Sequence, residues 1–221
     1  MKFRHEYKHQ VNSLDLLLLQ KRLPAIMQRD DFSREDGTYY IKSLYFDTYT
    51  DKALREKTDG VDKREKFRIR YYNEDTSFIR LEKKSKINGM CLKESTPITK
   101  EECQKIIDGD IDFLLKRNQP ILRELYVKMR TGLLRPKNIV AYNRESFVYA
   151  PGNTRVTLDM DICGSYNVKK FLSPDISMTK LYHTAILEVK WDEYLPEIIE
   201  KVAGLKNRRT SAFSKYAAVR F

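Results

Sequence analysis

Charged and apolar residues alternate through several segments of the chain. The segment 66–71 reads Lys-Phe-Arg-Ile-Arg-Tyr, and segments 80–86, 142–144, 155–161 and 187–191 follow the same two-residue period. Successive side chains of a β-strand point to opposite faces. Each segment therefore predicts a strand with one apolar face and one charged face.

The remaining pattern predicts an α+β protein with eight strands and with helices between or after them. Strands are expected at 4–11, 39–47, 64–73, 78–86, 90–95, 139–149, 155–162 and 184–191. Helices are expected at 13–27, 100–108, 120–134, 195–202 and 211–218. Thr99 and Glu102 have the spacing of a capping box. A polar turn is expected at 74–77, and Asn88-Gly89 is a strong hairpin-turn signal. Eight antiparallel strands suffice to close a barrel.

The charged faces have two possible environments. A single alternating strand is usually half-buried, with its charged side in water. Here the pattern recurs on six strands, and the apolar faces of the helices need something to pack against. If the helices pack outside on the apolar strand faces, the charged faces turn inward. We therefore expect a barrel with a charged lumen.

The overall charge favours a polyanionic partner. Lys and Arg number 42 against 31 Asp and Glu, a formal net charge of +11, which suits nucleic acid, polyphosphate, a nucleotide or an anionic membrane. The three cysteines include no CxxC pair and indicate a reducing compartment. No apolar run is long enough to span a bilayer. We expect one domain over residues 1–221, located in the cytoplasm.

A cationic lumen indicates a polyanionic ligand. Like charges that are buried together are costly unless they are paired or hydrated, so the lumen makes sense if it holds a polyanion. Arg and Lys both bind phosphate. A divalent ion held by Glu188 could bridge phosphate oxygens, since Mg²⁺ and Mn²⁺ prefer oxygen ligands.

Seven short motifs, in this order, resemble a known family. They are Arg4-His5-Glu6-Tyr7-Lys8, Ser43-Leu44-Tyr45-Phe46-Asp47-Thr48, Arg68-Ile69-Arg70, Leu81-Glu82-Lys83-Lys84, Tyr142-Asn143-Arg144, Glu188-Val189-Lys190 and Ser214-Lys215-Tyr216. The chain resembles the VTC domain, the polyphosphate polymerase domain of the vacuolar transporter chaperone complex. That domain belongs to the triphosphate tunnel metalloenzymes, together with the CYTH proteins.

The resemblance implies an eight-stranded antiparallel tunnel with helices outside and an enzyme that moves the γ-phosphate of ATP to a polyphosphate chain. Its implied catalytic residues are Arg68, Arg70, Lys84, Arg144, Arg155 and Lys215. Its implied substrate-binding residues are Lys8, Lys93, Tyr142 and Ser214. Glu188 is the implied ligand of Mn²⁺ or Mg²⁺. Glu6 either assists the metal or pairs with neighbouring cations.

One departure bears on the activity. Hydrolytic CYTH proteins carry Glu-x-Glu-x-Lys on the first strand, where this chain has Arg4-x-Glu6-x-Lys8. One fewer carboxylate favours a polymerase over a two-metal hydrolase. Two alternatives stay open: a metal-dependent inorganic triphosphatase or nucleoside triphosphatase, and a non-catalytic module that binds polyphosphate or nucleic acid. The expected partners are ATP and polyphosphate rather than nucleic acid, with possible association with a membrane partner. The oligomeric state stays open.

Overall fold

The computed structural model describes residues 4–30, 34–87, 90–181, 185–205, 210 and 213–220. The strands are β1 (His5–Val11), β2 (Gln28–Arg29), β3 (Thr38–Asp47), β4 (Arg64–Tyr72), β5 (Asp75–Ile87), β6 (Met90–Ile98), β7 (Arg135–Tyr149), β8 (Thr154–Ser165), β9 (Thr179–Lys180) and β10 (Ala185–Trp191). The helices are α1 (Ser13–Arg22), α2 (Lys52–Thr58), α3 (Lys100–Asp108), α4 (Pro120–Thr131), α5 (Glu197–Val202) and α6 (Lys215–Ala218). Short 3₁₀ turns are η1 (Leu23–Ala25), η2 (Asp112–Lys116), η3 (Pro151–Asn153) and η4 (Val168–Lys170).

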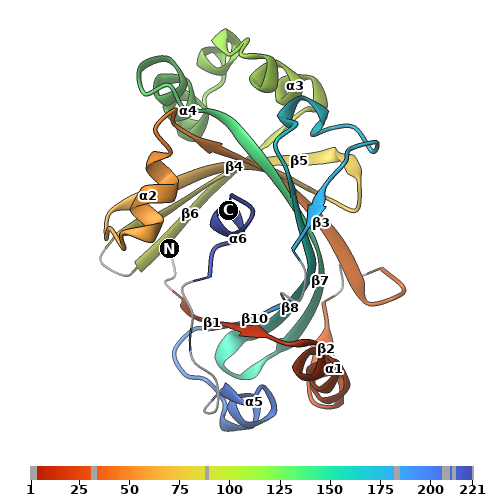
Figure 1. The fold of residues 1–221 in the computed structure, drawn as a ribbon. Coiled ribbons are helices and arrows are strands. Elements are labelled where there is room, and N and C mark those ends of the chain that lie inside the picture. Colours follow the sequence, from red (N-terminus) through yellow and green to blue (C-terminus); the bar gives the residue numbers. More distant parts are fainter. Residues whose placement is uncertain are drawn as a thin grey trace.

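One antiparallel sheet organises the fold. Its strands follow the order β1-β10-β8-β7-β3-β4-β5-β6, and the two-residue strands β2 and β9 pair with β7 and β8. In Figure 1 the sheet curves around a central space, with β1 and β10 on one side and β4 and β5 on the opposite side. The expected mixed α+β class with an antiparallel sheet is confirmed.

The expected closed barrel of eight strands is wrong. Within the described residues the sheet has ten strands, and β1 and β6, at the ends of the path, do not pair. Counting strands shows only that closure is possible, because tilt and stagger decide whether the last strand meets the first. A side-chain ion pair spans the space between β1 and the strand next to β6, since Lys84 Nζ on β5 lies 3.6 Å from Glu6 Oε2 on β1.

The outer face of the sheet is apolar and carries the helices, as the alternation predicts. Near β4 and β5, Phe67 and Leu81 belong to a core with Ile106 of α3 and Leu122 of α4. On the other side of the molecule, residues of β8 and β10 pack with Leu19 of α1 and Ile199 of α5. Figure 1 shows these four helices outside the curved sheet.

Helix α6 is the exception to this arrangement. It lies inside the curve of the sheet (Figure 1), although all helices were expected outside. Its Tyr216 is buried in a third core with Ile41, Val140 and Ile186, and its hydroxyl donates to the Asp47 carboxylate. Part of the inner face is therefore apolar, and the short helix covers it.

Local boundaries differ where turn geometry decides them. The β4–β5 turn is Asn73-Glu74, both at positive φ (53° and 58°), so β5 begins three residues before the expected Phe78. Helix α2 was not expected at all, and α1 stops at Arg22 rather than 27. The capping box at Thr99 is confirmed. The Asn88-Gly89 turn lies outside the described residues, as does the expected start of the last helix at 211. No described helix has both the length and the apolar character needed to cross a membrane.

Candidate functional site

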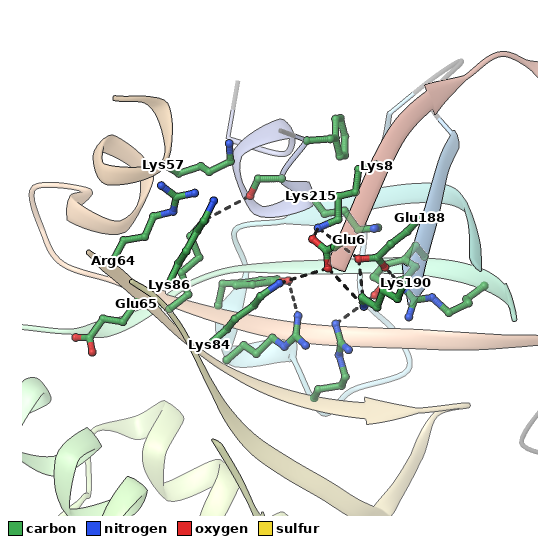
Figure 2. Close-up of a pocket in the computed structure, with 18 residues that line it drawn as sticks. Glu6, Lys8, Lys57, Arg64, Glu65, Lys84, Lys86, Glu188, Lys190 and Lys215 are labelled. Carbon is green, nitrogen blue, oxygen red and sulfur yellow. Dashed lines mark hydrogen bonds and ion pairs between the residues drawn. The ribbon is translucent and has the colours of Figure 1, made fainter. Parts of the chain in front are cut away.

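A cavity of about 370 Å³ lies within the curve of the sheet (Figure 2). Eleven Lys and Arg residues line it, with three glutamates, Glu6, Glu65 and Glu188. The Glu65 carboxylate is turned outward (Figure 2) and pairs with Lys83 and Lys128. The lumen is therefore strongly cationic, as the alternation predicts.

Ten of the twelve predicted site residues line this cavity. From the sheet they are Glu6, Lys8, Arg68, Arg70, Lys84, Tyr142, Arg144 and Glu188, and from the segment at α6 they are Ser214 and Lys215. Alternation places the strand residues on one face, and the curvature of the sheet turns β1, β10 and β7 towards β4 and β5. The structure thus brings together residues from both halves of the chain.

Two predicted residues lie elsewhere. The Arg155 side chain is 45% exposed, and its guanidinium lies 3.4 Å from Asp30 Oδ2. Asp159, four residues further along β8, pairs instead with Arg144 and Lys215. Asp161, at a bulge (φ 52°), pairs with Lys180. Lys93, on the edge strand β6, is 54% exposed and pairs with Glu82 at 2.5 Å. Neither residue lines the cavity.

Five lining cations were not among the predicted site residues: Lys57, Arg64, Lys66, Lys86 and Lys190. The period-two runs already include Lys66, Lys86 and Lys190, and one further step back from Lys66 reaches Arg64. We call Lys57, Arg64, Lys66 and Lys86 the Lys66 cluster. Nothing in the pattern indicates Lys57, because it sits on the unexpected helix α2 and reaches the cavity only through the tertiary fold.

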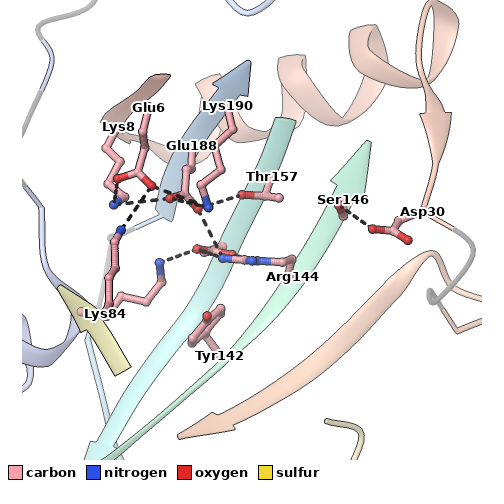
Figure 3. A network of polar contacts seen from close by, with 12 residues as sticks. Glu6, Lys8, Asp30, Lys84, Tyr142, Arg144, Ser146, Thr157, Glu188 and Lys190 are labelled. Atoms are coloured by element: carbon pink, nitrogen blue, oxygen red, sulfur yellow. Dashed lines mark hydrogen bonds and ion pairs between the residues drawn. The ribbon is translucent and has the colours of Figure 1, made fainter. Parts of the chain in front are cut away.

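One end of the cavity is densely ion-paired. We call Glu6, Lys8, Arg144, Glu188 and Lys190 the Glu188 cluster (Figure 3). Glu188 Oε1 lies 3.3 Å from the Lys8 ammonium and 3.2 Å from that of Lys190, and its Oε2 lies 3.6 Å from Arg144. Glu6 also pairs with Lys8 and Lys190. Burial opposes ionisation of Glu188, but Lys190, Lys8 and Arg144 hold the pKa of Glu188 well below its usual range.

A buried aspartate next to this cluster binds one of its cations. Asp159 on β8 is fully buried and accepts two hydrogen bonds from the Arg144 guanidinium. It also pairs with Lys215 of α6. Burial favours the neutral acid, yet Arg144 and Lys215 lower the pKa of Asp159. Asp159 therefore fixes the direction in which two lining cations point.

The β4 arginines are held in the cavity wall. Arg68 donates to Glu82 Oε2 at 2.7 Å and to the Tyr45 hydroxyl at 3.2 Å. Arg70 bonds instead to neutral groups, Ser43 Oγ at 3.0 Å and the Tyr142 hydroxyl at 3.2 Å. Burial raises the pKa of Glu82, but Arg68, Arg70 and Lys93 bring it to about 2.

The site provides a limited donor set for a metal ion. In the described part of the chain, no group of three Asp, Glu, His or Cys side chains is placed to hold a metal. Glu6 and Glu188 present two carboxylates, joined through the ammonium groups of Lys8 and Lys190. Mg²⁺ is often bound by one or two carboxylates together with substrate phosphates and water. The donor set fits an ion of that kind, bound along with a phosphate ligand.

The family model of the VTC domain matches residues 3–220. The chain belongs to the VTC domain family. The resemblance seen in its motifs is thereby confirmed, and it extends across both walls of the cavity and α6. No match was found among curated proteins.

Solved structures share the fold of this VTC domain at low identity. A putative adenylate cyclase from Bacillus halodurans is 13% identical with a TM-score of 0.58, and the match covers 95% of this chain and 92% of that one. A conserved hypothetical protein from Pyrococcus furiosus is 14% identical with a TM-score of 0.51, covering 98% and 99%. A Pyrococcus horikoshii protein is 13% identical with a TM-score of 0.50, covering 96% of each chain. Family and fold together indicate a domain of the triphosphate-tunnel kind.

Proposed function

We propose that this VTC domain binds the triphosphate of ATP in its basic cavity and transfers the γ-phosphate to a growing polyphosphate chain. The observation that carries the proposal is the convergence of eleven cations on one cavity, whose lining among the described residues includes two inward-turned carboxylates, Glu6 and Glu188. Phosphoryl transfer depends largely on positioning and on neutralising charge, and this wall supplies both.

The arginines are suited to fixed contacts with the phosphates. Arg68 and Arg144 are anchored by Glu82 and Asp159, so their remaining N–H groups are pre-oriented. Hydrogen-bond donors that are already oriented need little reorganisation when charge develops on the phosphate. They therefore stabilise that charge better than water does. Arg70 makes its hydrogen bonds to the Ser43 and Tyr142 hydroxyls and has no ion pair within the described residues, so its charge is available to an anion.

Glu188, with Glu6 beside it, would hold a Mn²⁺ or Mg²⁺ ion. When bound, such an ion polarises phosphate oxygens and neutralises charge that develops on them. Tyr142 would donate a hydrogen bond to phosphate, and Ser214 with Lys215 would approach from α6. The scarcity of carboxylates supports transfer over two-metal hydrolysis. Arg4, which replaces a carboxylate of the hydrolytic relatives, lies outside the cavity and pairs with Asp192 at 2.9 Å.

Incubation of the purified protein with ATP and Mn²⁺ tests the proposal. The expected products are ADP and a phosphate polymer, resolved by gel electrophoresis and digested by an exopolyphosphatase. Release of orthophosphate without polymer would instead identify a triphosphatase. Tight polyphosphate binding without turnover of any triphosphate would identify a binding module.

A further inference from the structure

Two residues of the family motifs are buried but do not line the cavity. They are Asp47, at the end of β3, and Tyr216, in α6. The two meet although they lie 169 residues apart in the chain, because the Tyr216 hydroxyl donates a hydrogen bond to the Asp47 carboxylate. Burial and the neighbouring Asp47 raise the pKa of Tyr216, so the hydroxyl stays protonated and can donate. This contact joins two motifs to which the cavity lining gives no role.

The Asp47 carboxylate also caps helix α2. Its Oδ1 accepts a hydrogen bond from the Ala53 N–H at 2.8 Å, and its Oδ2 accepts one from the Leu54 N–H at 3.1 Å. The first N–H groups of a helix have no partner within that helix. The N-cap residue Asp51 does not supply one, since it has φ 55° and its side chain makes no cap hydrogen bond. Asp47 therefore takes over the capping of α2 from outside the helix.

The Asp51 side chain binds α6 instead of capping its own helix. Its carboxylate lies 2.7 Å from the guanidinium of Arg220, which follows α6, and Arg220 donates to the Tyr216 hydroxyl at 3.2 Å. Two carboxylates before α2, those of Asp47 and Asp51, thus hold α6. Isolated short helices are not stable in water, and α6 has four residues. Its position therefore depends on contacts of this kind.

Both helices carry residues of the cavity lining. Lys57 lies on α2, and Ser214 and Lys215 lie at the start of α6. Figure 2 shows Lys57 and Lys215 as part of that lining. The Lys215 ammonium pairs with Asp159 and lies 4.7 Å from the centre of the Tyr142 ring. A shift of α6 would move this ammonium relative to the arginines of the cavity wall.

We propose that Asp47 is a positioning residue of the site. Through Tyr216 it holds α6 where Lys215 and Ser214 face the cavity, and through its cap on α2 it places Lys57. Its carboxylate lies outside the cavity lining, so it acts only through these two helices. This proposal rests on the proposed function in one respect, that the cavity binds a triphosphate.

A double-mutant cycle separates positioning from a purely structural role. The affinity for tripolyphosphate is measured by calorimetry for the wild-type protein, Tyr216→Phe, Lys215→Gln and the variant that combines both changes. Tyr216→Phe keeps the ring in the core and removes only the hydroxyl that donates to Asp47. The matched control is Tyr71→Phe. Tyr71 is equally buried and donates to the Phe171 carbonyl oxygen at 2.7 Å, but it does not line the cavity.

Lys215→Gln should lower the affinity about tenfold, since hydrogen bonds to charged groups contribute on this scale. Tyr216→Phe should lower it about threefold in the wild-type background and much less in Lys215→Gln, because residues that act through one another are not additive. Asp47→Asn, which presents an amide where Tyr216 and Leu54 donate, should lower the affinity at least as much as Tyr216→Phe. Tyr71→Phe should keep the wild-type affinity.

Wild-type affinity in Tyr216→Phe overturns the positioning role. An equal loss with and without Lys215, or an equal loss in Tyr71→Phe, overturns it as well, because a general loss of structure would act in every background. A wild-type protein that does not bind tripolyphosphate overturns the positioning role and the proposed function together. A wild-type protein that binds tripolyphosphate but does not turn over ATP overturns only the activity, and the cycle still decides the role of Asp47.

Discussion

Two parts of the cavity, the Glu188 cluster and the Lys66 cluster, carry similar numbers of cations but differ in how those cations are paired. In the Glu188 cluster, three cations share two carboxylates, and Asp159 anchors one of them from beneath. In the Lys66 cluster, four cations face one another across β4, β5 and α2 with no carboxylate partner among the described residues. Internal pairing lets buried charges persist without a ligand. Where the cations are unpaired, they repel one another in the folded protein, and a bound polyanion would remove that repulsion.

This difference assigns separate tasks to the two halves. Paired arginines and lysines are held in position and are suited to chemistry at a fixed phosphate. The unpaired cations, on α2 and near the ends of β4 and β5, are less constrained. This suits a chain whose successive phosphates need no single position. Four predictions test this contrast, and they are ordered by the size of the expected effect.

The largest effect is expected at the buried support of the paired half. Asp159→Asn leaves the Arg144 and Lys215 cations without their shared carboxylate. Breaking a buried pair in this way costs about 3–5 kcal/mol, which we expect to see as a fall in the free energy of unfolding in urea. Asp161→Asn on the same strand is the control. Its pair with Lys180 is 50% exposed, so its loss should cost no more than about 1 kcal/mol. Equal costs for the two variants would contradict the support role.

The next effect concerns turnover. Glu188→Gln keeps the shape of the side chain but removes the charge that would hold a metal ion and balance Lys8 and Lys190. We expect Mn²⁺-dependent turnover of ATP to fall at least about 100-fold, the upper end of losses seen even for residues that only support metal ligands. Glu94→Gln, on the outer face beside Lys83, should retain activity. Wild-type rates in Glu188→Gln would remove Glu188 from the site.

A smaller effect should appear as pH dependence in the unpaired half. Burial lowers the pKa of Lys66 from its ordinary value of 10.5 to about 8. The charged and titratable groups around it are Tyr45, Asp47, Lys57 and Arg64. Between pH 8 and 10.5 the unfolded chain binds a proton at Lys66 that the folded chain has lost. The contribution of Lys66 to the free energy of unfolding should therefore increase as the pH rises from 8 to 10.5.

The same titration should affect the ligand. Protonated Lys66 attracts phosphate, so long-chain polyphosphate affinity should fall as pH rises through about 8. Lys66→Gln should flatten the pH profiles of the free energy of unfolding and of polyphosphate affinity. The control Lys63→Gln, at an exposed neighbouring residue, should leave both profiles unchanged. Parallel profiles for Lys66→Gln and wild type would show that Lys66 does not titrate in this range.

The smallest effect is on ligand-free stability. The double variant Lys57→Gln/Lys86→Gln relieves like-charge repulsion. The free energy of unfolding should rise by at most about 1 kcal/mol, which should appear as a slightly higher melting temperature. The gain should shrink at high salt, where exposed charges are screened. Lys52→Gln should show no gain, because it loses a favourable pair with Glu56. A fall in the melting temperature of the double variant would mean that these lysines stabilise the fold.

The sequence by itself determined the eight longer strands, the apolar outer face, the cationic inner face and ten cavity-lining residues out of twelve predicted site residues. All of these follow from the two-residue period or from short motifs, which are local properties of the chain. Only the tertiary structure decided that the sheet stays open, that α6 lies inside, and that Lys57 joins the site while Arg155 leaves it. Those outcomes depend on the tilt of the strands and on contacts between residues far apart in the chain. The pairing of carboxylates with particular cations is likewise decided by distances across the cavity, which no local pattern encodes.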